Sequence, residues 1–133
     1  MVVYGCGGME INDNGLLLIL RRGVKTFNNL WSNPGGKVEH GETAEQATIR
    51  ELNEELGIDV NVDYFIGTYR DYKRGSLFGI YYGFAVTIVG GEPRVMEPDK
   101  IAEVRRFPLD QLPDNLAPYT KQYYRDWIKW EGR

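Results

Sequence analysis

The chain has 133 residues, a length that suits one compact domain and is too short for two, so we expect a single domain over residues 1–133. Lys and Arg number 16 and Asp and Glu number 19, and the net charge of −3 argues against a broad basic face for nucleic acid or an anionic membrane. A single cysteine, Cys6, excludes an internal disulfide and a cysteine-rich zinc site, and it fits a cytoplasmic protein. No membrane span or signal peptide is predicted.

The N-terminal segment predicts a β-hairpin. Val2 to Ile11 is extended in character, Asn12 to Gly15 is a strong turn signal, and Leu16 to Leu20 is a short apolar run typical of a strand. A polar loop follows, over residues 23–29. After it, Pro34-Gly35-Gly36 forbids regular helix and allows the backbone to approach another group closely.

One helix is strongly predicted in the middle of the chain. Thr43 is a good N-cap, and Gln46 three residues later completes a capping-box pattern. We expect the helix to run to Leu56, with Gly57 as its left-handed stop.

The remaining elements complete a layered domain. Patterns rich in β-branched and aromatic residues predict strands, and the end of the chain predicts a closing helix. The strands are expected at Ile58–Tyr69, Leu77–Val89 and Ile101–Phe107, the charged segment Arg70–Gly75 joins the first two, and the helix is expected at Tyr119–Trp130. Strands with a helix between them and a helix at the end indicate an α/β or α+β fold.

The central helix gathers three carboxylates. At about 100° per residue, Ile49, Leu52 and Leu56 form one stripe that we expect to be buried, whereas Glu51, Glu54 and Glu55 share the opposite face. Like charges at these spacings repel one another, and a cation would remove the conflict. Carboxylates with no neighbouring His or Cys suit Mg²⁺ or Mn²⁺. Taken alone, three glutamates on one face also fit a solvated acidic surface.

The flanking residues distinguish these two interpretations, because together the segment resembles the Nudix (MutT-like) hydrolase family. The family signature is Gly, five residues, Glu, seven residues, then Arg-Glu-apolar-any-Glu-Glu-any-Gly-apolar. Over residues 36–58 the chain supplies all of it: Gly36, Glu42, Arg50, Glu51, Leu52, Glu54, Glu55, Gly57 and Ile58. Similar features outside the signature extend the resemblance over essentially the whole chain.

The resemblance implies the Nudix fold, an α/β/α sandwich around a mixed β-sheet, and Mg²⁺-dependent cleavage of a nucleoside diphosphate linked to a group X, with Mn²⁺ as a possible substitute. By similarity, Glu54, Glu55 and the carbonyl of Gly35 would ligate metal. Glu51 would be a ligand or the base for water, and Arg50 would orient it. Such roles are chemically sensible, since metal ions neutralise phosphate oxygens and activate water.

Other candidates surround this segment. Glu97 is a further acid for the site, with Glu103 as its competitor. Arg21, Arg22 and Lys37 are candidates for phosphate binding, but Arg21 and Arg22 continue opposite faces of a strand, so only one of the two is expected to face the site. Trp31 is a candidate for stacking on a base, as are Phe27, Tyr81 and Tyr82, although core packing is the better explanation for any one of them. Asn33 and Arg106 depart from the family pattern, which usually has apolar and aromatic residues at these places.

These patterns favour hydrolysis of a nucleoside triphosphate to the monophosphate and pyrophosphate. Hydrolysis of ADP-ribose or another nucleotide sugar is a second interpretation, and a catalytically silent nucleotide-binding domain that regulates a partner is a third. Removal of pyrophosphate from RNA 5′ ends would need a basic path that the charge does not indicate. We therefore expect a small nucleotide substrate, no extended nucleic acid, no membrane, and a monomer or homodimer.

Overall fold

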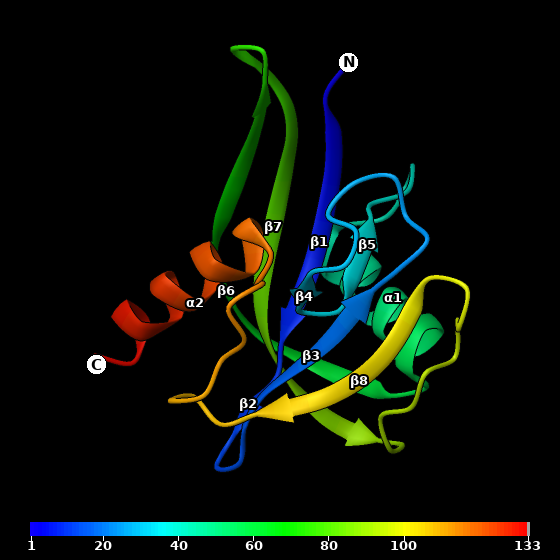
Figure 1. Cartoon of the computed structure of the whole chain (residues 1–133), viewed down its shortest axis with the longest axis vertical. Helices are drawn as coiled ribbons and strands as arrows, with labels where there is room; N and C mark the ends of the chain where they lie inside the picture. The colour runs from blue at the N-terminus through cyan, green and yellow to red at the C-terminus, as the bar shows by residue number, and fades with distance from the viewer. Residues whose placement is uncertain (133) are drawn as a thin grey trace.

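The computed structural model describes residues 1–132, which fold around two β-sheets (Figure 1). The first sheet has the order β5-β1-β7-β6. Its strands are β1 (Val3–Met9), β5 (Gly35–Lys37), β6 (Asp59–Lys73) and β7 (Ser76–Gly90). Strand β1 runs parallel to β7 and antiparallel to β5, so the sheet is mixed, as expected.

The second sheet is built around β3. Strand β3 (Gly15–Arg21) pairs with three neighbours, all antiparallel. These are β2 (Ile11–Asn12), β4 (Trp31–Ser32) and β8 (Ile101–Phe107). The predicted N-terminal hairpin is therefore wrong for most of its length. Only the two residues of β2 pair with β3 across the turn, because β1 has already joined β5 and β7 in the other sheet.

Two helices cover opposite faces of the mixed sheet. Helix α1 (Ala44–Leu56) packs on one side and α2 (Pro118–Trp130) on the other (Figure 1). Side chains alternate along β3, so Leu16 and Leu18 enter the α2 core while Leu17 and Ile19 enter the α1 core. This is the expected α/β/α sandwich. No helix within residues 1–132 is long and apolar enough to cross a membrane.

Strands β6 and β7 form a longer hairpin than the sequence predicts. Arg70 to Lys73 continue β6 and pair with β7, and the connection is only the two-residue turn Arg74-Gly75. Both turn residues have positive φ, 53° and 79°, which is the geometry of tight hairpin turns. The charges in this segment suggested a loop, but the pairing of its backbone with β7 keeps it extended.

Candidate active site

Helix α1 carries most of the candidate site, and its two ends are fixed as the sequence predicts. The backbone N–H of Gln46 donates to the Thr43 hydroxyl at 3.1 Å, and the Gln46 side chain accepts from the Thr43 N–H at 2.9 Å. Gly57 ends the helix in the left-handed conformation, with φ of 67°. These caps satisfy backbone groups that the helix leaves unpaired, so they fix the start and end of the helix that carries the carboxylates.

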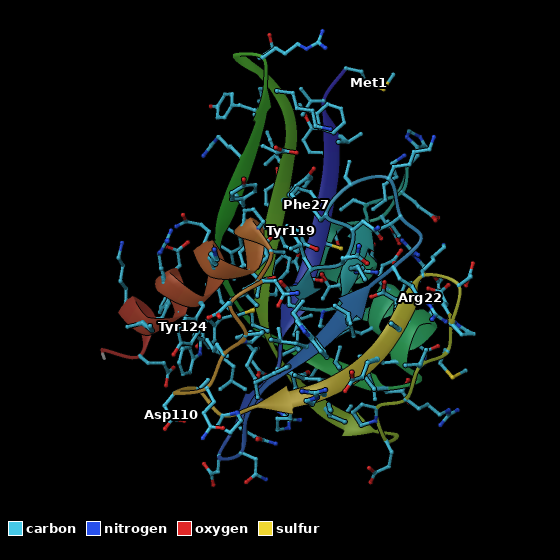
Figure 2. All side chains as sticks on the ribbon, in the orientation of Figure 1. Met1, Arg22, Phe27, Asp110, Tyr119 and Tyr124 are labelled. Atoms are coloured by element: carbon cyan, nitrogen blue, oxygen red, sulfur yellow. The ribbon has the colours of Figure 1, made fainter. Side chains whose placement is uncertain are left out.

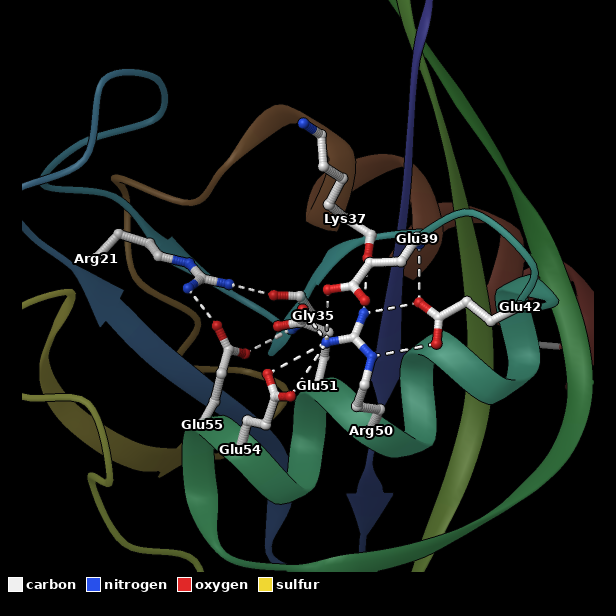
Figure 3. Close-up of polar contacts among 9 residues, drawn as sticks. All are labelled: Arg21, Gly35, Lys37, Glu39, Glu42, Arg50, Glu51, Glu54 and Glu55. Atoms are coloured by element: carbon white, nitrogen blue, oxygen red, sulfur yellow. Dashed lines mark hydrogen bonds and ion pairs between the residues drawn. The ribbon is translucent and has the colours of Figure 1, made fainter.

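Arg50 connects four of the acidic side chains (Figure 3). Its guanidinium donates two hydrogen bonds to the Glu42 carboxylate, from Nε at 3.1 Å and from Nη2 at 2.7 Å. From the other edge, Nη1 donates to Glu51 at 2.9 Å and to Glu54 at 3.2 Å. Hydrogen bonds to Glu42, Glu51 and Glu54 raise the pKa of Arg50. The hydrogen bonds from Arg50 in turn lower the pKa of Glu42. The planar guanidinium therefore sets the direction in which Glu51 points.

Glu55 is held by a second arginine. Arg21 Nη1 lies 2.5 Å from Glu55 Oε2, and Arg21 Nη2 donates to the carbonyl of Gly35 at 2.8 Å (Figure 3). The other oxygen of Glu55 accepts the N–H of Gly35 at 2.8 Å. Glu55 and the Gly35 carbonyl, both predicted metal ligands, thus share one guanidinium as their partner.

Burial raises the pKa of two carboxylates of α1, Glu51 and Glu55. The side chain of Glu55 is only 3% exposed, and burial raises its pKa to about 7, against the opposing effect of Arg21. Burial likewise raises the pKa of Glu51. A Cβ on Gly36 would lie 2.4 Å from the Glu51 carboxylate, so a glycine is needed there for Glu51 to rest against the β5 backbone. Two acids with raised pKa values at one site are typical of functional positions.

The buried stripe of α1 differs from the one predicted. Ile49 is 41% exposed, whereas Glu55 is buried beside Leu52 and Leu56. The helix packs across β1, β5 and β6, and this shifts its buried face toward Ala47, Thr48 and Glu55. Periodicity alone placed Glu55 toward solvent, because nothing on the helix indicates that Arg21 and Gly35 satisfy its charge.

A cavity of about 560 Å³ opens in front of these acids. It is within the usual range for small-molecule sites. Glu51, Glu54, Glu55 and the predicted fourth acid Glu97 line it, as does Cys6, whose thiol pKa is raised by burial. Four cationic side chains also line it, namely Arg21, Lys25, Lys37 and Lys100. The competitor Glu103 instead pairs with Arg105 at 2.6 Å on β8.

Aromatic side chains form another wall of the cavity. Phe27 and Tyr81, both named from the sequence, line it together with Phe78, Tyr119 and Tyr123. The sequence alone did not indicate that Phe78, Tyr119 and Tyr123 belong to the site, and the same holds for Lys25 and Lys100. Tyr119 and Tyr123 belong to the closing helix, and no local pattern tells which face of that helix meets the loop at residues 23–29.

Three of the proposed substrate-binding residues do not line the cavity, and one of them, Tyr82, packs against the α1 core. Arg22 donates through Nε to the carbonyl of Pro98 at 2.7 Å and does not line the cavity. The ring of Trp31 packs edge-on against Phe107 in the α2 core, with ring centroids 4.8 Å apart. Of the two neighbouring arginines, Arg21 is the one that the structure turns toward the carboxylates, since it continues the Leu17 and Ile19 face.

The two departures from the family pattern have structural partners. Buried Asn33 accepts a hydrogen bond from the Thr120 hydroxyl at 2.6 Å, and its own N–H donates back to that hydroxyl at 3.0 Å. Arg106 pairs with the buried carboxylate of Glu10 and donates to the Gly15 carbonyl at 2.9 Å. Asn33 therefore ties the segment before Gly35 to α2, and Arg106 neutralises a buried acid.

Comparison with known proteins agrees with this geometry. A NUDIX domain profile matches residues 5–130. The chain belongs to the Nudix family. An ADP-ribose pyrophosphatase from Methanocaldococcus jannaschii is 36% identical over 94% of this Nudix chain and 72% of its own length. A MutT-like protein from Streptomyces ambofaciens is 41% identical over 87% of this chain and 80% of its own length. The crystal structure of a MutT NUDIX hydrolase from Burkholderia pseudomallei superposes with a TM-score of 0.87, at 31% identity, over 95% and 98% of the two chains.

As a member of the Nudix family, this protein is a pyrophosphohydrolase, and the enzymes of the family use divalent metal ions. Its donor set of carboxylates and a main-chain carbonyl fits a hard cation. Within residues 1–132, no three acidic, histidine or cysteine side chains converge as they stand on a point that could hold an ion. Instead, the carboxylate oxygens face Arg50 and Arg21. A metal ion would therefore compete with two guanidinium groups for the same oxygens.

Proposed function

We propose that this chain is a Mg²⁺-dependent hydrolase of nucleoside triphosphates that releases the monophosphate and pyrophosphate. One observation carries the proposal: the acids of α1 and four cationic side chains line the same cavity. A nucleoside triphosphate carries more negative charge than the diphosphate group of ADP-ribose or of a nucleotide sugar. Lys25, Lys37 and Lys100 place positive charge around it, in addition to Arg21, which also pairs with Glu55.

The chain's own residues have distinct roles in this proposal. Glu54, Glu55 and the Gly35 carbonyl would hold the metal ion. When bound, Mg²⁺ neutralises phosphate oxygens and makes water more acidic. Glu51 accepts a proton from the attacking water or adds a ligand, and Arg50 keeps its carboxylate in place. Glu97 is a second candidate for the base, and Arg21 and Lys37 bind phosphate oxygens.

A second substrate class has specific support. The relative from Methanocaldococcus jannaschii is named an ADP-ribose pyrophosphatase and is 36% identical over most of this chain. The bond broken would be of the same kind, a phosphoanhydride between two phosphorus atoms. Hydrolysis of ADP-ribose at the same carboxylates is therefore our alternative.

A substrate panel separates these proposals. Nucleoside triphosphates, ADP-ribose and nucleotide sugars are each incubated with Mg²⁺ or with excess chelator, and products are quantified by chromatography. We expect a triphosphate to give the highest kcat/KM, with no turnover in chelator and recovery on adding Mg²⁺. A higher kcat/KM for ADP-ribose would favour the alternative. Full activity in chelator would refute the metal site, and nucleotide-induced thermal stabilisation without any turnover would indicate a silent binding domain.

A further inference from the structure

Arg22 is a predicted substrate-binding residue that does not line the cavity. Its guanidinium donates two hydrogen bonds to one acceptor, the carbonyl of Pro98, from Nε at 2.7 Å and from Nη2 at 2.5 Å. Its backbone N–H donates to the carbonyl of Lys100 at 2.9 Å. Figure 2 shows Arg22 beside the start of β8, directly after the segment that contains Pro98 and Lys100. The side chain and the main chain of Arg22 therefore both hold the end of the loop before β8.

The segment that Arg22 holds is a tight turn over residues 97–100. The N–H of Lys100 donates to the carbonyl of Glu97 at 3.0 Å across the turn. Pro98 stands at the second position, where such turns favour proline. The bond that closes a turn of this kind leaves the carbonyl of the second residue without a partner inside the turn. Two N–H groups of Arg22 supply that partner and anchor the turn to the end of β3.

The chain around Arg22 is shaped for this anchor. Gly23 has a φ of 64°, and a Cβ there would lie 2.8 Å from the carbonyl oxygen of Asp99, so glycine lets the two backbones approach closely. The pairing of β3 with β8 also shifts register between Leu20 and Arg21. Irregularities of this kind re-aim side chains next to active sites. Beyond the shift, Arg21 faces the carboxylates of α1 and Arg22 faces the turn.

The two ends of the turn face the cavity, because Glu97 and Lys100 both line it. Burial raises the pKa of Glu51, and the charges of Glu54 and Glu97 add to this rise, so the turn lies near the carboxylates of α1. Within residues 1–132 the ammonium group of Lys100 forms no salt bridge, and its charge is available to an anion. The Lys100 side chain is exposed. Such a side chain binds an anion more tightly when its backbone is already fixed, because less conformational freedom is lost on binding.

We propose that Arg22 is a positioning residue, which anchors the turn at residues 97–100 so that Lys100 binds the pyrophosphate part of the substrate. The inference rests on the proposed function, because it gives the turn a role in binding the group that hydrolysis releases. Arg22 acts through the Pro98 carbonyl and does not itself contact the substrate. This role differs from the direct phosphate contact that the sequence suggested for Arg22.

The test measures pyrophosphate binding without turnover. Dissociation constants for inorganic pyrophosphate are determined by calorimetry in excess chelator. Arg22→Met removes every side-chain donor, whereas Arg22→Gln removes the charge but keeps an N–H group at the place of Nε, which donates to Pro98 at 2.7 Å. Lys100→Met, alone and combined with Arg22→Met, completes a double-mutant cycle. Arg94→Met is the matched control, because Arg94 lies exposed in the same loop, contacts Met96 and does not line the cavity.

We expect Arg22→Met and Lys100→Met each to weaken pyrophosphate binding about tenfold, the effect of losing one charged hydrogen bond. Arg22→Gln should stay within about threefold of the wild type, since it keeps one of the two bonds to the turn. Arg94→Met should leave the dissociation constant unchanged. In the Lys100→Met background, Arg22→Met should change it by less than about twofold, because the anchored turn then carries no cation to position.

Several results would overturn the proposal. Wild-type affinity in Arg22→Met would do so, as would a wild type that binds no pyrophosphate. An equal loss from Arg22→Met with and without Lys100 would mean that Arg22 meets the anion directly. A loss in Arg22→Gln or in Arg94→Met as large as in Arg22→Met would mean that charge, and not the anchor, is responsible. The expected pattern in a protein that hydrolyses no phosphoanhydride would refute the proposed function alone.

Discussion

Replacing Glu55 with glutamine should change how the stability of the metal-free protein depends on pH. The folded-state pKa of Glu55 is about 7, raised from the ordinary 4.5 because burial disfavours the charged form. The folded protein therefore holds this proton more tightly than the unfolded chain does. The stability that the carboxyl contributes is full below pH 4.5 and is lost as the pH rises through 7.

The size of the effect follows from the two pKa values. The pKa of Glu55 is about 7 in the folded protein and 4.5 in the unfolded chain. At roughly 1.4 kcal/mol per pKa unit, this difference corresponds to about 3 kcal/mol of unfolding free energy. Glutamine in place of Glu55 does not titrate. The unfolding free energy of Glu55→Gln, minus that of the wild type, should therefore increase by about 3 kcal/mol between pH 4 and pH 8. Hydrolysis by the variant should be lost, so the buried carboxylate costs stability at neutral pH in exchange for function.

Urea denaturation in excess chelator, followed by tryptophan fluorescence at several pH values, measures this difference. Groups that titrate alike in both proteins cancel in the subtraction. A difference that stays constant from pH 4 to pH 8 would refute the reasoning, and so would one that moves in the opposite direction. A constant difference would mean that Arg21 cancels the cost of burying the Glu55 carboxylate, and the opposite direction would mean that it more than cancels that cost.

The remaining predictions concern three single substitutions. Glu54→Gln should lower turnover by orders of magnitude, with unfolding free energy changed by less than about 1 kcal/mol, because its carboxylate is half-exposed and its ion pair with Arg50 is weak. Leu52→Ala should behave oppositely, costing about 2–5 kcal/mol through a core cavity while the ligands stay in place. An active but early-melting Glu54→Gln would contradict this assignment. Thr120→Val should cost about 1–3 kcal/mol in chemical denaturation, since it removes the hydroxyl that bonds the side-chain oxygen and the backbone N–H of buried Asn33, and an unchanged midpoint would argue against these bonds.

Local chemistry predicted the parts of the fold that depend on neighbours in sequence. The capping box at Thr43, the left-handed Gly57 and strand β8 all follow from short patterns whose physics is complete within a few residues. The partition of strands into two sheets does not. Whether β1 pairs with β3 or with β7 is decided by long-range packing, and the turn at Asn12 to Gly15 is compatible with both.

The site shows the same division. The signature located Glu51, Glu54 and Arg50, and strand alternation correctly implied that only one of Arg21 and Arg22 would face the carboxylates. The burial of Glu55 depends on a guanidinium from a strand 34 residues away in sequence. The aromatic wall depends on a loop, a strand and a helix meeting. Neither feature leaves a local trace in the sequence.

Hydrolysis of a nucleoside triphosphate with Mg²⁺ in water enriched in ¹⁸O tests the central claim most directly. If the carboxylates of α1 direct water to an internal phosphorus, the first products will be the nucleoside monophosphate and pyrophosphate, and mass spectrometry will find one ¹⁸O atom in one of these two products. Orthophosphate as the first product would contradict the account.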